Sequence, residues 1–111
     1  MSNSDCPVCR TADVVCGKWT LLVIRDLAEG RARFCELERS LAGISPRTLS
    51  LRLRALEEEG IVERHTFGEV PPRVEYALTP LGATLAGPLR ALGAWSVAHG
   101  KHVEEIGRAH V

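Results

Sequence analysis

The stretch SPRTLSLRLRALEEEG, residues 45–60, predicts the central helix of the domain. Ser45 is a favourable N-cap, and Pro46 suits the first helical position because an N–H there has no partner within the helix. Gly60 can end the helix in a left-handed conformation. Both ends of this helix are therefore marked in the sequence.

The two faces of this helix differ in chemistry. Leu49, Leu53 and Leu56 recur at i, i+4 and i+7, so they share one face and should pack inward. The opposite face and its borders carry Ser45, Pro46, Arg47, Thr48, Ser50, Leu51, Arg52 and Arg54. Arginine reads guanine and small apolar groups contact the thymine methyl, so this face suits the major groove of DNA. For this helix alone, an amphipathic helix with its arginines in water is the alternative.

Composition sets only broad limits on function. The 111 residues are enough for one domain, and 45% hydrophobic with 25% charged residues is ordinary for a soluble globular protein. Fourteen basic and fourteen acidic residues cancel, so only local clustering can indicate nucleic-acid binding. No apolar run approaches the ~20 residues of a membrane span, and residues 1–5 lack the features of a signal peptide. We therefore expect a cytoplasmic protein that contacts no membrane.

Helical patterns precede the central helix. A short helix is expected over residues 6–16 and a core helix over residues 18–27. Phe34, Leu37 and Leu41 then recur at helical spacing, and a glycine-containing turn leads into the central helix. Two short helices joined by such a turn, with arginines on the second, predict a helix-turn-helix.

After the central helix the hydrophobic period changes from helical to alternating. Residues 61–67 and 73–78 are rich in β-forming residues, and the Gly- and Pro-containing segment between them predicts a turn. The resulting β-hairpin has the position of the wing in a winged helix. Basic side chains of a wing lie along the phosphates or enter the minor groove, and Arg64, His65 and Arg73 are the candidates here. For Arg64 and His65, an exposed strand face without a DNA contact is the alternative.

A helical pattern resumes at Thr79, an N-cap that is again followed by proline, and continues over residues 79–107. Pro88 predicts a kink or split, with a new helix starting there. Beyond it, apolar residues keep a helical spacing, in the set Leu89, Leu92, Trp95, His99 and Val103. Because a terminal apolar stripe needs a covering surface, we expect it to pack against a second copy of the chain. Packing onto its own domain only is the alternative.

These motifs, in this order, closely resemble the HxlR-type family of winged-helix transcriptional regulators, which are related to the MarR group. The resemblance covers roughly residues 6–95, and it includes residues 17–22, 43–50 and 71–76. A string of motifs in register is far more specific than a single helix-turn-helix pattern. The resemblance implies one domain over residues 1–111 with an α+β, mainly α, winged helix-turn-helix fold and a two-stranded wing.

The same resemblance implies how the domain is divided and what it binds. The DNA-binding core would span residues 17–78 with the wing at 61–78, and dimerisation helices would occupy 6–16 and 79–107. A homodimer would read an inverted repeat in double-stranded DNA. By motif, recognition falls on Ser45, Pro46, Arg47, Thr48 and Ser50, and the wing contact falls on Arg73.

The N-terminal cysteines are candidates for a sensor. Some HxlR-type regulators sense oxidants or electrophiles through a cysteine near the N-terminus, and Cys6 matches that position. The start of a helix lowers a thiol pKa, and Cys9 would then be a resolving thiol, unless Cys6 bridges to the second subunit. Inert cysteines are the alternative. Cys16 and Cys35 lie beside apolar positions and are expected to be small buried core residues.

Other classes of function are less well supported. A zinc site would need a second ligand pair at suitable spacing, and a thiol enzyme built on Cys6 and Cys9 would need a strand–helix–strand unit. No Walker loop, dinucleotide fingerprint or nucleophile elbow is present. We expect a DNA-binding regulator without enzymatic activity, metal or cofactor, and an oxidant or small-molecule effector is compatible with this reading. A winged helix used only for protein contacts is the alternative.

Overall fold

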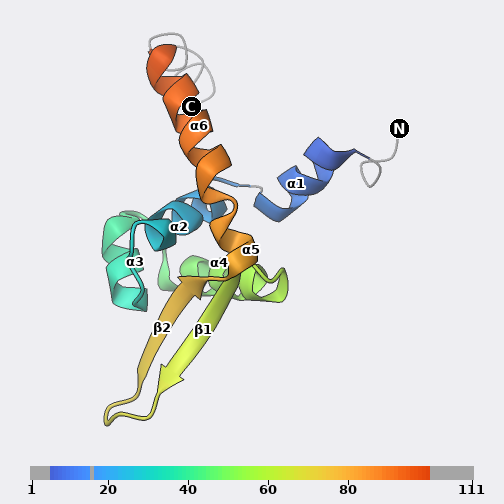
Figure 1. Ribbon diagram of the computed structural model, residues 1–111. Coiled ribbons are helices and arrows are strands. Elements are labelled where there is room, and N and C mark those ends of the chain that lie inside the picture. The colour runs from blue at the N-terminus through green and yellow to red at the C-terminus, as the bar shows by residue number, and fades with distance from the viewer. Residues whose placement is uncertain (1–5, 16, 101–111) are drawn as a thin grey trace.

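The computed structural model describes residues 6–15 and 17–100. The elements are α1 (Pro7–Val15), α2 (Lys18–Ala28), α3 (Phe34–Ser40), α4 (Pro46–Glu58), β1 (Val62–Phe67), β2 (Arg73–Leu78), α5 (Pro80–Ala83) and α6 (Ala86–Ala98). Figure 1 shows a helical body made by α2, α3 and α4, with the β-hairpin projecting on one side and α6 on the opposite side. The predicted fold class, mainly helical with a two-stranded antiparallel sheet, is confirmed.

Helix α4 begins and ends where its sequence predicts. The N–H of Thr48 donates a 3.1 Å hydrogen bond to Oγ of Ser45, which is the N-cap, and Pro46 occupies the first position. At the other end Gly60 has φ +75°, the left-handed region that favours glycine. Both ends of the helix are therefore defined by local features of the chain.

The hydrophobic core lies where α2, α3 and α4 pack against one another and against the base of the hairpin. Its buried side chains are Val23, Ile24, Leu27, Leu37, Leu41, Ile44, Leu49, Leu53, Leu56, Ile61 and Val62. The inner face predicted for α4 is thus confirmed, and each of its buried leucines contributes about 1.5–3 kcal/mol through burial. The outer face of α4 is held in a fixed orientation as a result.

The hairpin is anchored at its base and extends away from the body. Strands β1 and β2 pair in antiparallel register from Val62 opposite Leu78 to Phe67 opposite Arg73. Within β1 only Val62 is buried, and the other five side chains are exposed. A 2.8 Å hydrogen bond from the N–H of Tyr76 to the carbonyl oxygen of Ala32 also ties β2 to the segment before α3.

A short helix connects the hairpin to α6. The hydroxyl of Thr79 donates to the carbonyl oxygen of Gly60 at 2.6 Å and accepts from the N–H of Gly82 at 3.0 Å. Residues 84 and 85 then separate α5 from α6, so the predicted split is present. The new helix begins at Ala86 rather than at Pro88, because a proline in the first turn of a helix lacks only an N–H that has no partner there.

Helix α6 leaves part of its apolar surface uncovered. Leu89 packs against the core, whereas Leu92 and Trp95 are 64% and 55% exposed. The imidazole of His99 stacks on the indole of Trp95, with ring centroids 4.9 Å apart. Val103, the last residue of the predicted stripe, lies outside the described residues.

Candidate nucleic-acid interface

The outer face of α4 is open to solvent along its N-terminal half. Ser45, Pro46, Arg47, Ser50, Leu51 and Arg54 are exposed, and Thr48 and Arg52 are half-buried at the borders of the face. Leu51 is 50% exposed although it lies in the middle of the helix. The structure therefore brings all eight predicted residues of this helix to one surface and its borders.

The arginines of α4 are not engaged by other side chains. In residues 6–15 and 17–100, no hydrogen bond or ion pair holds the guanidinium of Arg47, Arg52 or Arg54. A guanidinium carries five N–H donors and no acceptor, so these groups have their full capacity for an anionic or carbonyl partner. The guanidinium groups on this face can therefore donate hydrogen bonds to acceptors such as phosphate or guanine oxygens.

The hydroxyl groups at the start of α4 have a local role. Oγ of Ser45 donates to Oγ1 of Thr48 at 2.9 Å as well as accepting from its backbone N–H. Both side chains therefore stabilise the N-terminus of the helix. The hydroxyl proton of Thr48 and the hydroxyl of Ser50 are the groups left for an external partner.

The wing contains basic side chains in two different states. Arg64 is exposed and has no ion-pair partner among the described residues, while Nε2 of His65 lies 3.2 Å from a carboxylate oxygen of Glu63. Arg73 is half-buried, and its Nη2 atom lies 3.2 Å from Oε1 of Glu69. The two arginines predicted for the wing therefore reach its surface, but of the two only Arg64 has no ion-pair partner among the described residues.

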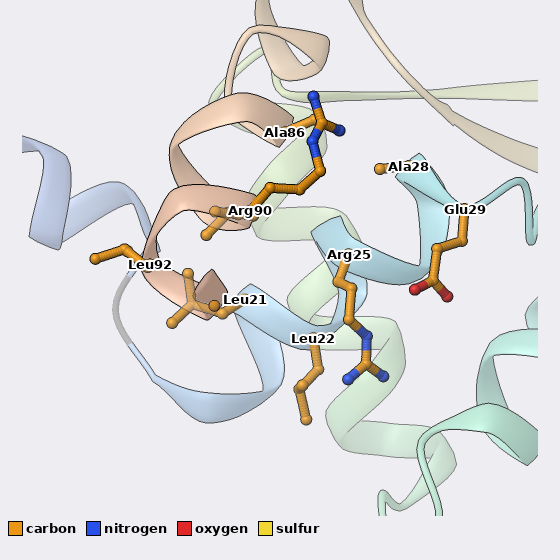
Figure 2. Close-up of a pocket in the computed structure, with 10 residues that line it drawn as sticks. Leu21, Leu22, Arg25, Ala28, Glu29, Ala86, Arg90 and Leu92 are labelled. Carbon is orange, nitrogen blue, oxygen red and sulfur yellow. The ribbon is translucent and has the colours of Figure 1, made fainter. Parts of the chain in front are cut away.

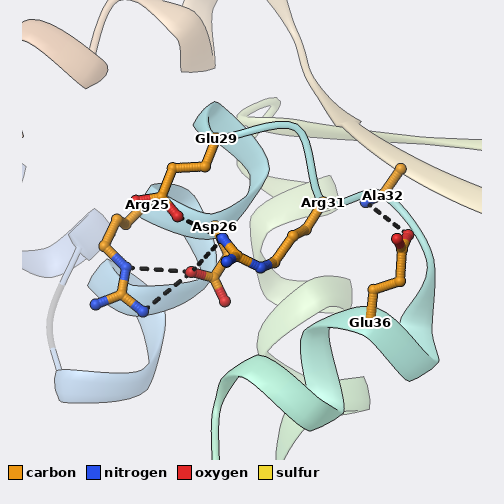
Figure 3. Close-up of polar contacts among 6 residues, drawn as sticks. All are labelled: Arg25, Asp26, Glu29, Arg31, Ala32 and Glu36. Carbon is orange, nitrogen blue, oxygen red and sulfur yellow. Dashed lines mark hydrogen bonds and ion pairs between the residues drawn. The ribbon is translucent and has the colours of Figure 1, made fainter.

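A buried carboxylate fixes the connection between α2 and α3, as Figure 3 shows. Asp26 is 0% exposed, and its Oδ1 accepts hydrogen bonds from Nε and Nη2 of Arg25 at 3.1 and 3.0 Å. Nη1 of Arg31 lies 3.5 Å from the same oxygen, and the backbone N–H of Arg31 donates to the carbonyl oxygen of Asp26. Oε1 of Glu36 accepts from the N–H of Ala32 at the start of α3. These contacts hold the segment between α2 and α3, and α2 also packs against α4.

Three residues near the candidate interface were missed by reasoning from sequence. Asp26 lies three and four residues after Val23 and Leu22, so an acidic residue on an apolar helix face was the signal that could have identified it. Phe67 and Glu69 lie at the end of β1 and in the turn. Both contact Arg73 on the other side of the turn, and the spacing of residues in the sequence does not show which side chains meet there.

A hollow of about 550 Å³ lies between α2 and α6 (Figure 2). Its lining is largely apolar, with Leu21, Leu22, Ala28, Ala86, Leu89 and Leu92 among the lining residues. Arg25, Glu29 and Arg90 provide its charged groups. The hollow adjoins the exposed apolar part of α6, so the two features form one continuous uncovered surface.

The two N-terminal cysteines interact with each other. Cys6 directly precedes α1, and the backbone N–H of Cys9 donates to Sγ of Cys6 at 3.4 Å. This hydrogen bond, with one from the Cys9 side chain, lowers the pKa of the Cys6 thiol, whereas the bond to Cys6 raises the pKa of Cys9. The pKa of Cys6 is therefore shifted in the direction expected for a thiol at a helix start, and its main cause is the contact with Cys9.

The expectation for the other cysteines was wrong in one case. Cys35 is exposed, because its position on α3 faces away from the core that Leu37 enters. Cys16 lies outside the described residues. Helical spacing next to apolar residues was therefore not enough to indicate burial of this thiol.

Among residues 6–15 and 17–100, no group of three or more His, Cys, Asp or Glu side chains is placed to hold a metal ion. None of the described helices combines the length and apolar character that crossing a membrane requires.

Comparison with known proteins identifies relatives along most of the chain. Residues 14–104 match the family model described as HxlR-like helix-turn-helix. An HTH-type transcriptional regulator of Synechocystis is 44% identical over 87 residues, which cover 78% of this chain and 64% of that protein. Another, from Methanothermobacter thermautotrophicus, is 40% identical over 102 residues, which cover 92% of this chain and 78% of that protein.

The fold has a solved counterpart as well. The structure of the redox regulator HypR in its reduced form superposes with a TM-score of 0.85 at 38% identity, covering 90% of this chain and 99% of that chain. The relatives are transcriptional regulators and not enzymes. The match extends over the helix-turn-helix, the hairpin and α6. The chain belongs to the HxlR-like helix-turn-helix family of transcriptional regulators.

Proposed function

We propose that this chain is a sequence-specific DNA-binding regulator that acts in the cytoplasm as a homodimer and reads an inverted repeat. The observation that carries the proposal is the outer face of α4, where Arg47, Arg52 and Arg54 have no partner among the described residues. The N-terminal half of α4 enters the major groove, and the residues Ser45, Pro46, Arg47, Thr48, Ser50, Leu51, Arg52 and Arg54 face the DNA. Arg64 and Arg73 of the wing contact the adjoining backbone.

The distribution of charge along α4 supports this docking. Its first ten residues contain three arginines and no acidic residue, whereas Glu57 and Glu58 lie in its last turn and Glu59 follows as the C-cap. A helix on its own is stabilised by the opposite arrangement of charge. This order of charges along α4 is explained if its N-terminal half contacts a polyanion and its acidic end points away from the polyanion.

The test of DNA binding is a footprint on the DNA upstream of the chain's own gene and of the neighbouring genes. We expect a protected inverted repeat with half-sites about one helical turn apart, ~34–36 Å, because two-fold symmetry sets that spacing. Titration at several salt concentrations separates specific from random binding. Weak, salt-sensitive binding without a footprint would instead favour a winged helix that contacts other proteins.

The uncovered surface of α6 supports the homodimer. Leu92 and Trp95 are exposed, and the hollow between α2 and α6 continues the same apolar surface. Exposed apolar patches of this kind mark interaction sites, and a second copy of α6 has the matching chemistry. The proposed interface comprises Leu89, Leu92, Trp95, His99 and Val103, with the dimerisation helices at residues 6–16 and 79–107.

A matched pair of substitutions tests the dimer. Trp95→Glu places a charge in the proposed interface, and Val70→Glu places the same charge at a wing position that is 100% exposed. We expect sedimentation to give a dimer for the parent chain and for Val70→Glu, and a monomer for Trp95→Glu. A dimer that persists in Trp95→Glu would contradict the proposed interface.

A thiol switch is the second proposed function, and the contact between Cys6 and Cys9 favours it. A lowered thiol pKa increases the reactive thiolate near neutral pH, and HypR, a structural relative, is a redox regulator. An oxidant is then the effector, and it acts at the N-terminal helix, which is part of the proposed dimer interface.

The switch is tested by repeating the footprint after mild treatment with diamide. We expect oxidation to alter the footprint of the parent chain and of Cys35→Ser, which removes an exposed thiol elsewhere. Cys6→Ser is expected to be insensitive. Alkylation at increasing pH should modify Cys6 at a lower pH than Cys9, since their pKa values are shifted in opposite directions. A footprint that is the same before and after diamide treatment would leave these cysteines without a sensing role.

A further inference from the structure

Three side chains meet at the outer end of the wing. Phe67 and Arg73 face each other as the last cross-strand pair of the hairpin. The guanidinium carbon of Arg73 lies 4.3 Å from the centroid of the Phe67 ring, and Nη2 lies 3.2 Å from Oε1 of Glu69 in the turn. In Figure 1 this end of the hairpin lies far from the helical body, so these contacts are made within the wing itself.

The ring and the carboxylate act on the guanidinium in different ways. The face of an aromatic ring attracts a cation and holds a planar guanidinium parallel to it, without using any of its N–H donors. The carboxylate of Glu69 instead forms an ion pair with Nη2. Nε of Arg73 is buried and has no hydrogen-bond partner within the described residues. Arg73 is thus oriented by Phe67 and partly neutralised by Glu69, and most of its donor capacity is unused.

We propose that Phe67 and Glu69 are positioning residues for Arg73, and that DNA binding exchanges the Glu69 carboxylate for a backbone phosphate. This inference rests on the proposed DNA-binding function. Phe67 keeps the guanidinium at the end of the wing during the exchange, so that its orientation is already set when the phosphate arrives. Glu69 holds the charge of Arg73 in the free protein and weakens the attraction of the wing to any DNA.

The exposure of the pair makes the exchange feasible. The side chains of Arg73 and Glu69 are 31% and 54% exposed. An ion pair this close to solvent is weak, and a phosphate oxygen accepts from arginine with at least comparable strength. The exchange leaves the contact with Phe67 in place, because that contact is made by the guanidinium carbon over the ring and uses no N–H donor.

The test measures affinity for a short random-sequence DNA duplex at several salt concentrations, since phosphate contacts are independent of sequence. We expect Glu69→Gln to bind about two- to five-fold more tightly than the parent chain, the range set by an exposed ion pair. Phe67→Leu should bind about two- to five-fold more weakly, and Phe67→Tyr should restore affinity because it retains the aromatic face.

Two controls separate positioning from general effects. Glu63→Gln removes a wing carboxylate that contacts His65 and not Arg73, so it measures the effect of losing a wing carboxylate without changing the partner of Arg73. In an Arg73→Gln background, the gain from Glu69→Gln should fall to that of Glu63→Gln, and the difference between Leu and Tyr at position 67 should vanish. The salt dependence should decrease by about one phosphate in Arg73→Gln.

The outcomes also separate this inference from the function on which it rests. If the parent chain binds the duplex but Glu69→Gln gains no more than Glu63→Gln, the exchange is wrong while DNA binding stands. An equal gain with and without Arg73 has the same meaning. If Phe67→Tyr is as weak as Phe67→Leu, the ring has only a packing role. A parent chain that binds no DNA at low salt would overturn both proposals.

Discussion

Arg47 at the start of α4 and Arg73 at the end of the wing differ in what holds them in place. Arg47 lies on a helix whose opposite face is buried in the core, and its own side chain has no partner among the described residues. Arg73 lies on a two-stranded hairpin that projects from the body, and a ring and a carboxylate hold its side chain.

The difference follows from the support that each element receives. A helix packed along its length fixes the direction of its exposed side chains through the backbone, so no further contact is required. An isolated hairpin is marginally stable, and only Val62 of β1 is buried. The wing therefore positions its arginine through side chains of its own, and these bring an acidic residue close to the proposed DNA contact.

The largest expected effect comes from removing the support of α4. Leu53→Ala deletes a side chain that is 1% exposed, so we expect the free energy of unfolding to fall by about 2–5 kcal/mol. Leu51→Ala, on the outer face of the same helix, should change it by less than about 0.5 kcal/mol. Urea unfolding followed by circular dichroism measures both. Similar losses for the two variants would show that α4 is not held by one face only.

The second expected effect compares the two arginines directly. Arg47→Lys keeps the charge and loses the planar group that pairs with guanine, so binding to the footprinted DNA should weaken by about 1–3 kcal/mol, with little change on random DNA. Arg73→Lys should lose less than about 1 kcal/mol on either DNA, because a phosphate contact needs mainly charge. Competition gel shifts measure the four affinities. Equal losses on specific and random DNA for Arg47→Lys would remove its role in reading bases.

Local chemistry explains why the elements could be predicted from sequence. Ser45, Pro46 and Gly60 mark the limits of α4, and their action depends only on residues within the same few turns. The alternating pattern of β2 and the turn before it are likewise local signals. The outer face of α4 followed from the helical period, since the buried leucines determine which side remains exposed.

What could not be predicted depends on contacts between residues that a turn or a loop separates along the chain. The burial of Asp26 between Arg25 and Arg31, and the pairing of Arg73 with Phe67 and Glu69, arise from the packing of separate segments. Cys35 was expected in the core because it lies beside apolar residues in the sequence. Its side chain is exposed, because neighbouring positions on a helix such as α3 point to different faces. Predicting the environment of a side chain therefore requires the fold as well as the sequence pattern.

The smallest expected effect concerns Ser45, the N-cap that fixes the first turn of α4. Ser45→Ala removes the acceptor of the Thr48 N–H, so stability should fall by about 0.5–2 kcal/mol. Ser50→Ala, on the same exposed face but without a capping contact, should leave stability within about 0.5 kcal/mol of the parent chain. Unfolding curves and amide exchange in residues 47–49 measure the two variants. Because Ser45 orients the first turn, faster exchange confined to that turn is expected, with Leu53 still buried. Unchanged exchange in Ser45→Ala would mean that core packing alone fixes the start of the helix, which would widen the contrast with the wing.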